Sequence, residues 1–193
     1  MSSNYLLGEY DPKRLLWLVK TLEDQSRYNW TTIASANVTP NYNDEYFLIN
    51  KGYLVLDSGL KDKIKNKDYS ISLDVYPTQA VANSNYVVPV SLGGSNTVGG
   101  DVFFNHSSDS IIWYAGGPRI QKNNIGFSFN KWYHIEFMRE GGLFKLLLDE
   151  TLIGTSDFSV TNNAMDFYIG ANQSAPSQET MIGYVKNIIV RLL

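Results

Sequence analysis

The chain has 193 residues, a formal net charge of −3 at pH 7 and no cysteine. Hydrophobic residues make up 44% and charged residues 18%, a balance typical of one globular domain with a core of its own. The lack of cysteine excludes disulfides, thiol catalysis and cysteine-bound zinc, and without a basic face we expect no nucleic-acid binding. No run of about 18 apolar residues occurs, so we expect no membrane insertion.

The chain begins MSSNYLLGEYDPKR, which lacks the charged start and apolar centre of a signal peptide. We therefore expect the protein in a virion, or outside the cell without an N-terminal signal peptide, or otherwise in the cytoplasm.

Residues 12–25 are predicted to form a short N-terminal α-helix. Asp11 suits the N-cap and Pro12 suits the first helical position. Apolar residues then recur with the spacing i, i+3, i+4, i+7: Leu15, Leu18, Val19 and Leu22. The helix either covers the rest of the protein or docks to a partner chain or a second copy. We treat residues 1–27 as a helical attachment segment and residues 28–193 as a separate β domain.

After residue 28 the chain alternates between β-rich runs and clusters of Asn, Gly, Ser and Asp, which predicts an all-β antiparallel domain. Several runs alternate apolar and polar residues, as in YSISLDVY, YHIEFMR and LFKLLLD, so one face of each should lie on a core. A two-sheet sandwich follows from so many short strands. The candidate strands are residues 31–36, 46–49, 52–56, 69–76, 86–92, 102–105, 110–114, 125–129, 133–139, 143–149, 151–155, 167–169 and 181–191.

Five motifs follow one another along the chain: YSISLDVYP, VVPVSLGG, FNKWYHIEFMREGGLFKLLLDETLIG, MDFYIGA and MIGYVKNIIVRL. In this order they resemble the laminin G-like branch of the concanavalin A-like lectin/glucanase superfamily over about residues 50–193. The resemblance implies a jelly-roll sandwich, in a family whose members bind sugars, proteins or calcium or hydrolyse glucans. The N-terminal segment has no counterpart in it.

We expect the protein not to be an enzyme. The glucanase branch carries E-x-D-x-x-E on one strand, and this chain lacks that motif, with Asp74 and Glu136 each alone on its strand. His134 shares a strand face with Glu136, which we interpret as a surface or inter-sheet polar pair. No G-x-S-x-G elbow occurs.

Sugar recognition would use exposed aromatic rings beside hydrogen-bonding side chains. The candidate ligand contacts are Trp113, Tyr114, Arg119 and Tyr86, although an ordinary amphipathic sheet face would also explain them. Trp132 begins a motif strand and is interpreted as a packing residue.

No cofactor is expected, with calcium as the one candidate that the resemblance raises. Asp101 follows a glycine-rich loop and Asn172 follows the YIGA strand, so both could supply oxygen ligands. Turn formation alone would also explain an Asp and an Asn at such positions.

The preferred hypothesis is a non-catalytic module that recognises carbohydrate or a cell-surface ligand. The short segment before a lectin-like domain resembles bacteriophage tail, baseplate or capsid proteins, so the module would serve adhesion by a virion. The alternative is a structural assembly or decoration protein of a virus particle without sugar binding. A glycoside hydrolase is the second alternative.

Overall fold

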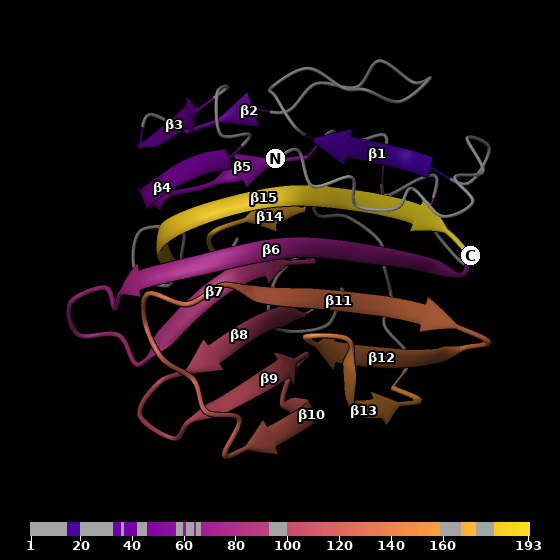
Figure 1. The fold of residues 1–193 in the computed structure, drawn as a ribbon. Helices are drawn as coiled ribbons and strands as arrows, with labels where there is room; N and C mark the ends of the chain where they lie inside the picture. Colours follow the sequence, from indigo (N-terminus) through magenta and orange to yellow (C-terminus); the bar gives the residue numbers. More distant parts are fainter. Residues whose placement is uncertain are drawn as a thin grey trace, which may run out of the picture.

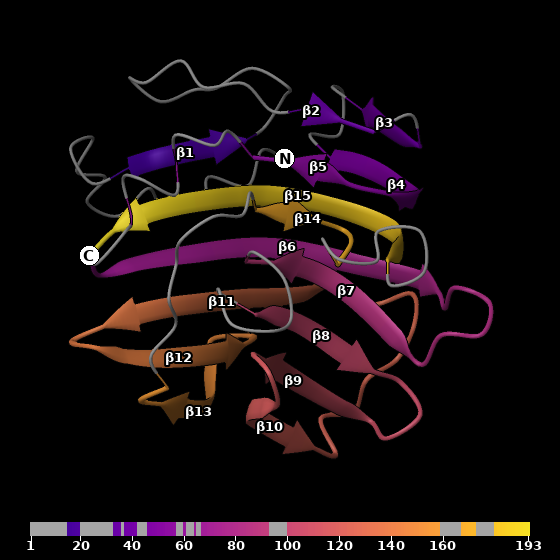
Figure 2. The same cartoon turned by 180° about the vertical axis from the view of Figure 1, so that it is seen from behind.

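The computed structural model of the protein describes residues 15–19, 33–35, 37–41, 46–56, 60, 64, 67–92, 100–158, 167–172 and 180–193. Two antiparallel sheets pack face to face, which confirms the predicted all-β sandwich (Figure 1; seen from behind in Figure 2). No helix within these ranges is long and apolar enough to span a membrane.

The larger sheet has eight strands among the described residues, and the long strands β6 and β15 lie side by side at its centre. Its order is β13-β12-β11-β6-β15-β4-β3, with β1 also paired to β15. Their bounds are β1 (Leu15–Val19), β3 (Val38–Asn41), β4 (Tyr46–Gly52), β6 (Tyr69–Gln79), β11 (Tyr133–Glu140), β12 (Leu143–Leu148), β13 (Thr151–Ser156) and β15 (Met181–Leu192).

The smaller sheet has seven strands in the described part of the chain, in the order β10-β9-β8-β7-β14-β5-β2. They are β2 (Ile33–Ala34), β5 (Leu54–Val55), β7 (Tyr86–Ser91), β8 (Asp101–Asn105), β9 (Ser110–Tyr114), β10 (Pro118–Asn123) and β14 (Tyr168–Ile169).

The core forms where the alternating apolar residues of the two sheets meet. Alternation along β6 turns Ile71, Leu73 and Val75 inward, and all three are buried. The predicted alternation of β11 and β12 is confirmed in the same way, with these inward residues buried: Tyr133, Ile135, Phe137, Phe144, Leu146 and Leu148.

Trp113 joins the two sheets. It projects from β9 of the smaller sheet and is fully buried. Its ring centroid lies 5.1 Å from that of Phe137 and 4.9 Å from that of Phe144, which belong to β11 and β12 of the larger sheet. One large aromatic side chain thus packs against two strands of the opposite sheet.

The helix predicted over residues 12–25 is wrong where the structure describes that segment. Residues 15–19 form β1, antiparallel to the end of β15. A run of five successive apolar residues suits a strand as well as a helix, and periodicity alone does not separate the two. β4 pairs with residues 181–185 of β15. On the same edge of β15, β1 supplies backbone partners for residues 188–191. The rest of the predicted helix lies outside the described residues, and the domain boundary at residue 28 stays a prediction.

The strand predicted over residues 125–129 is also wrong. The backbone N–H groups of Gly126 and Phe127 donate to the Asp109 carboxylate, at 3.2 and 2.6 Å, and not to a neighbouring strand. Gly126 has a φ of 70°, which breaks the extended path. Strands β3 and β10 were not predicted. The other predicted strands are confirmed in position, although several are shorter than expected.

We expect Trp113→Ala to lower the free energy of unfolding by about 3–5 kcal/mol, because it leaves a cavity between the sheets. Tyr114→Ala, the next residue on the opposite face of β9, should cost about 1 kcal/mol. Urea unfolding followed by far-UV circular dichroism measures both values. Equal losses in the two variants would show that Trp113 does not hold the sheets together.

Candidate functional site

A row of aromatic side chains crosses the outer face of the larger sheet, and we call it the aromatic row: Trp132, Tyr76, Tyr184 and Tyr46. Tyr76 and Tyr184 face each other across β6 and β15 because these residues are paired in the strand register. Trp132 stands directly before β11, next to Tyr76. Successive ring centroids are 5.2, 5.7 and 4.9 Å apart. Trp132 is 37% exposed and the three tyrosines are half-buried, so the row is open to solvent.

A second row of polar side chains lies one pleat further along the same three strands, and we call it the polar row: Lys186, Asp74, His134 and Asn187. Asp74 of β6 is paired with Lys186 of β15 on one side and with His134 of β11 on the other. Strand alternation places residues i and i+2 on one face, so the polar row lies directly beside the aromatic row. The Lys186 ammonium joins them, because its nitrogen stands 4.4 Å from the Trp132 ring centroid.

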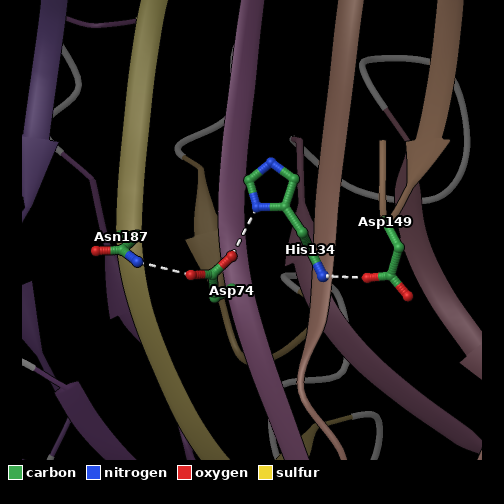
Figure 3. Close-up of polar contacts among 4 residues, drawn as sticks. All are labelled: Asp74, His134, Asp149 and Asn187. Carbon is green, nitrogen blue, oxygen red and sulfur yellow. Dashed lines mark hydrogen bonds and ion pairs between the residues drawn. The ribbon is translucent and has the colours of Figure 1, made fainter. Parts of the chain in front are cut away.

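Asp74 is the centre of the polar row (Figure 3). Its Oδ1 lies 2.6 Å from His134 Nδ1, and its Oδ2 accepts a hydrogen bond of 2.6 Å from Asn187 Nδ2. Both carboxylate oxygens are therefore engaged by neighbouring strands, and the side-chain contacts bridge β15, β6 and β11.

A β-bulge in β15 brings Asn187 to this position. The register against β6 shifts between Lys186 and Ile189, and Asn187 has a φ of 51°. Asn tolerates this left-handed conformation better than most residues. The extra residue in the bulge turns the Asn187 side chain toward Asp74.

The backbone of His134 is held by the turn that follows β12. Its N–H donates to Asp149 Oδ1 and its carbonyl accepts from the Asp149 N–H, both at 2.8 Å. Asp149 and Glu150 both have positive φ, at 48° and 65°, as a two-residue hairpin turn requires. The imidazole therefore projects from a fixed backbone.

The two titratable groups of the pair shift each other's pKa in opposite directions. Burial acts to raise the pKa of Asp74, but the hydrogen bonds from His134 and Asn187, with the nearby positive charges, outweigh burial and hold it below its ordinary value of 3.8. The hydrogen bond to Asp74 raises the pKa of His134 above 6.5 against the opposing effect of burial, and the charges of Asp74, Glu136 and Glu150 add to the increase.

This arrangement suits binding better than catalysis. Flat, open aromatic rings beside fixed polar groups are the usual features of a sugar-binding face. Among the described residues the imidazole of His134 is hydrogen-bonded to Asp74 alone, so no hydroxyl nucleophile is hydrogen-bonded to it there. Asp74 has a lowered pKa and no oxygen left unengaged, so it is poorly equipped to be the proton donor of a glycosidase.

The sequence-predicted ligand contacts are divided between the core and the other face of the sandwich. Tyr86 and Tyr114 lie on the outer face of the smaller sheet around Phe103, with ring centroids 4.8 and 6.3 Å from it. Arg119 donates from Nε to the Ala115 carbonyl at 2.8 Å, and its guanidinium stands 3.5 Å from the Phe158 ring centroid. The expectation for Trp113 is corrected: it is fully buried between the sheets and has no surface to offer a ligand.

The two residues proposed as calcium ligands, Asp101 and Asn172, do come together. Both are buried, and Asn172 Nδ2 donates to Asp101 Oδ2 at 3.0 Å. Calcium takes about six to eight oxygen ligands, whereas Asn172 turns its amide nitrogen toward the carboxylate. The described residues also hold no cluster of three or more His, Cys, Asp or Glu side chains. They fit a buried structural hydrogen bond and do not by themselves complete a calcium site.

Neither row on the larger sheet was predicted from the sequence. Trp132 was interpreted as packing and Asp74 as isolated, although alternation already places each of them opposite the inward residues of its strand. The sequence does not show which strands are neighbours or in which register. The pairing of His134 with Asp74, 60 residues apart, therefore could not be predicted from it.

Residues 49–188 match the family model described as the concanavalin A-like lectin/glucanases superfamily, of the laminin G type, and the chain belongs to this family. No curated protein sequence matches it. The fold is similar to the binding domain of botulinum neurotoxin serotype D, with 14% identity, a TM-score of 0.68 and coverage of 93% of this chain and 48% of that one.

Two further similar structures are of related neurotoxins. One concerns botulinum neurotoxin type C, with 14% identity and a TM-score of 0.64 over 93% of this chain and 48% of that one. The other is the binding domain of neurotoxin DC in complex with rat synaptotagmin II, with 16% identity and a TM-score of 0.64 over the same shares. This chain thus spans about half the length of the structures that it matches, and the likeness concerns the fold.

We expect the pair of His134 and Asp74 to stabilise the fold most in the window where both are charged. His134 has a raised pKa, so its contribution is complete below its ordinary value of 6.5 and is lost as the pH rises through the raised pKa. Asp74 has a lowered pKa, so its contribution is present above 3.8 and is lost as the pH falls through the lowered pKa.

Because the imidazole is partly exposed, His134→Gln should lower the free energy of unfolding by only about 0.5–1 kcal/mol at about pH 5.5. The difference from the unsubstituted protein should shrink toward about pH 9, as measured by urea unfolding across this range. A difference that grows with pH would contradict the assigned ion pair.

Proposed function

We propose that this protein is a non-catalytic binding module that recognises a carbohydrate on a cell surface through the outer face of its larger sheet. The observation that carries the proposal is the aromatic row beside the fixed polar row. Pyranose rings present apolar C–H faces that stack on aromatic rings, and their hydroxyls need hydrogen-bonding partners close by.

The similar structures support a binding role. To enter cells, botulinum neurotoxin type C depends upon interaction with two ganglioside molecules. The binding domain of neurotoxin DC is seen in complex with rat synaptotagmin II and, in another structure, with SialylT. Those ligands belong to proteins about twice as long as this chain, so they support cell-surface recognition in general and assign no particular ligand here.

The place of the module in a virion stays a prediction. It rests on the analogy drawn from the first residues of the chain, most of which lie outside the described residues. Within the described part, residues 15–19 belong to the larger sheet as β1. An attachment role would therefore fall to the other residues of the N-terminal segment.

We expect Trp132→Ala to weaken carbohydrate binding by about tenfold or more, because it removes the most exposed ring of the row. A glycan array and a bacterial-cell binding assay, read by fluorescence, measure the change. The matched control is Tyr114→Ala, which removes a half-buried aromatic ring from the outer face of the smaller sheet.

The result separates three cases. Binding that is lost in Trp132→Ala and kept in Tyr114→Ala would locate the site on the larger sheet. The reverse would move it to the sequence-predicted residues Tyr86 and Tyr114. No retention of the folded protein on any glycan or cell would overturn the proposed function and favour the assembly role.

A further inference from the structure

The two ring nitrogens of His134 have different surroundings. Nδ1 lies 2.6 Å from Asp74 Oδ1, and a carboxylate only accepts, so Nδ1 carries a proton in both the neutral and the charged ring. Figure 3 shows the other ring nitrogen, Nε2, on the side of the ring away from Asp74. The side chain is 38% exposed, and within the described residues Nε2 has no hydrogen-bond partner. Protonation of His134 is therefore protonation of Nε2.

A change of charge at His134 reverses the hydrogen-bonding role of Nε2. In the neutral ring Nε2 holds a lone pair and accepts, whereas in the charged ring it holds a proton and donates. The pKa of His134 is raised by Asp74, Glu136 and Glu150, so the change falls above the ordinary value of 6.5. The switch therefore operates at a pH above 6.5, on the surface where the aromatic row is open.

The neighbouring charges limit the ligands that this nitrogen can take. Carboxylates surround His134 on its neighbouring elements. Those of Asp74 on β6, Glu136 on β11 itself and Glu150 in the turn after β12 act on the imidazole. The carboxylate of Asp149, in the same turn, accepts from the His134 backbone N–H. Lys186 on β15 is the cation of the polar row. Four carboxylates against Lys186 and His134 leave this region negative even when His134 is charged, which disfavours an anionic ligand.

Uncharged sugar groups differ in how they respond to the switch. A hydroxyl can turn to donate to the neutral ring or to accept from the charged ring, so its hydrogen bond survives either state. An acetamide carbonyl can only accept. It gains a charge-assisted hydrogen bond from the protonated ring and meets a lone pair on the neutral one.

Resting on the proposed function, we infer that His134 is the specificity-determining residue of the site. It selects uncharged, N-acetylated glycans by donating from Nε2 to the acetamide carbonyl of a sugar stacked on the aromatic row. Binding of these glycans therefore tightens as the pH falls, while binding of hydroxyl-only glycans changes little.

The test uses the full chain on an array of matched oligosaccharides, among them chitotetraose and cellotetraose, which differ only in the acetamido group at position 2. The array also carries sialylated and sulfated glycans. For each matched pair the preference for the N-acetylated member should increase by about three- to tenfold between about pH 9 and about pH 5.5. In His134→Gln, which does not titrate, the preference should be equal at the two pH values.

Two results would overturn the inference and leave the proposed function intact. One is a preference for the N-acetylated glycan that does not change with pH in the unsubstituted protein. The other is a preference that changes with pH by the same factor in His134→Gln. Retention of sialylated or sulfated glycans alone would overturn it as well. No glycan retained at either pH would overturn the proposed function and this inference together.

A measurement without ligand keeps the inference testable if the His134→Gln variant fails to fold. In ¹⁵N-correlated NMR spectra of the unsubstituted protein, the neutral His134 ring should carry its proton on Nδ1. A proton on Nε2 in the neutral ring would remove the donor–acceptor reversal and overturn the inference without reference to any ligand.

Discussion

The register of β6 between β15 and β11 is the constraint on which the core and the candidate site both depend. Alternate residues of β6 enter the core and the outer face, so a slip of one residue would place Asp74 between the sheets and Val75 in solvent. That slip would be costly for two reasons. The apolar inner residues would lie in solvent, and charged Asp74 would be buried without either of its hydrogen-bond donors. Trp113 of the smaller sheet packs against Phe137 and Phe144 of the larger sheet. This packing depends on the same register, because it needs Phe137 of β11 to point inward.

The two faces of the larger sheet differ in character: the inner face forms the core, and the outer face carries the proposed binding site. Inner side chains are mostly apolar and buried, and their burial is the dominant favourable contribution to folding. The outer face carries rings that remain open and polar groups that are held by cross-strand hydrogen bonds and by a bulge. Rigid strands hold such groups more accurately than loops do, which suits a surface that binds a ligand without changing shape.

Membership of the concanavalin A-like lectin/glucanases superfamily defines the architecture and leaves the ligand open. At 14–16% identity to the neurotoxin structures, individual binding residues do not carry over. The proposed function therefore rests on this chain's own side chains. In the proposed function, the charge state of His134 would connect the fold to ligand choice, since the hydrogen bond that positions the ring also decides which nitrogen titrates.

Local patterns in the sequence determined the fold class. Period-two alternation in YSISLDVY, YHIEFMR and LFKLLLD specifies which residues of each strand enter a core, because successive side chains on a strand point to opposite faces. The apolar run Leu15–Val19 carries no such information, and only its pairing with β15 made it a strand. Trp113 and Trp132 are each followed by a tyrosine, yet one lies in the core and the other on the surface. The site was decided by tertiary structure, because strand order and register bring Asp74, His134 and Asn187 together from three distant parts of the chain, and short-range sequence patterns do not encode those long-range pairings.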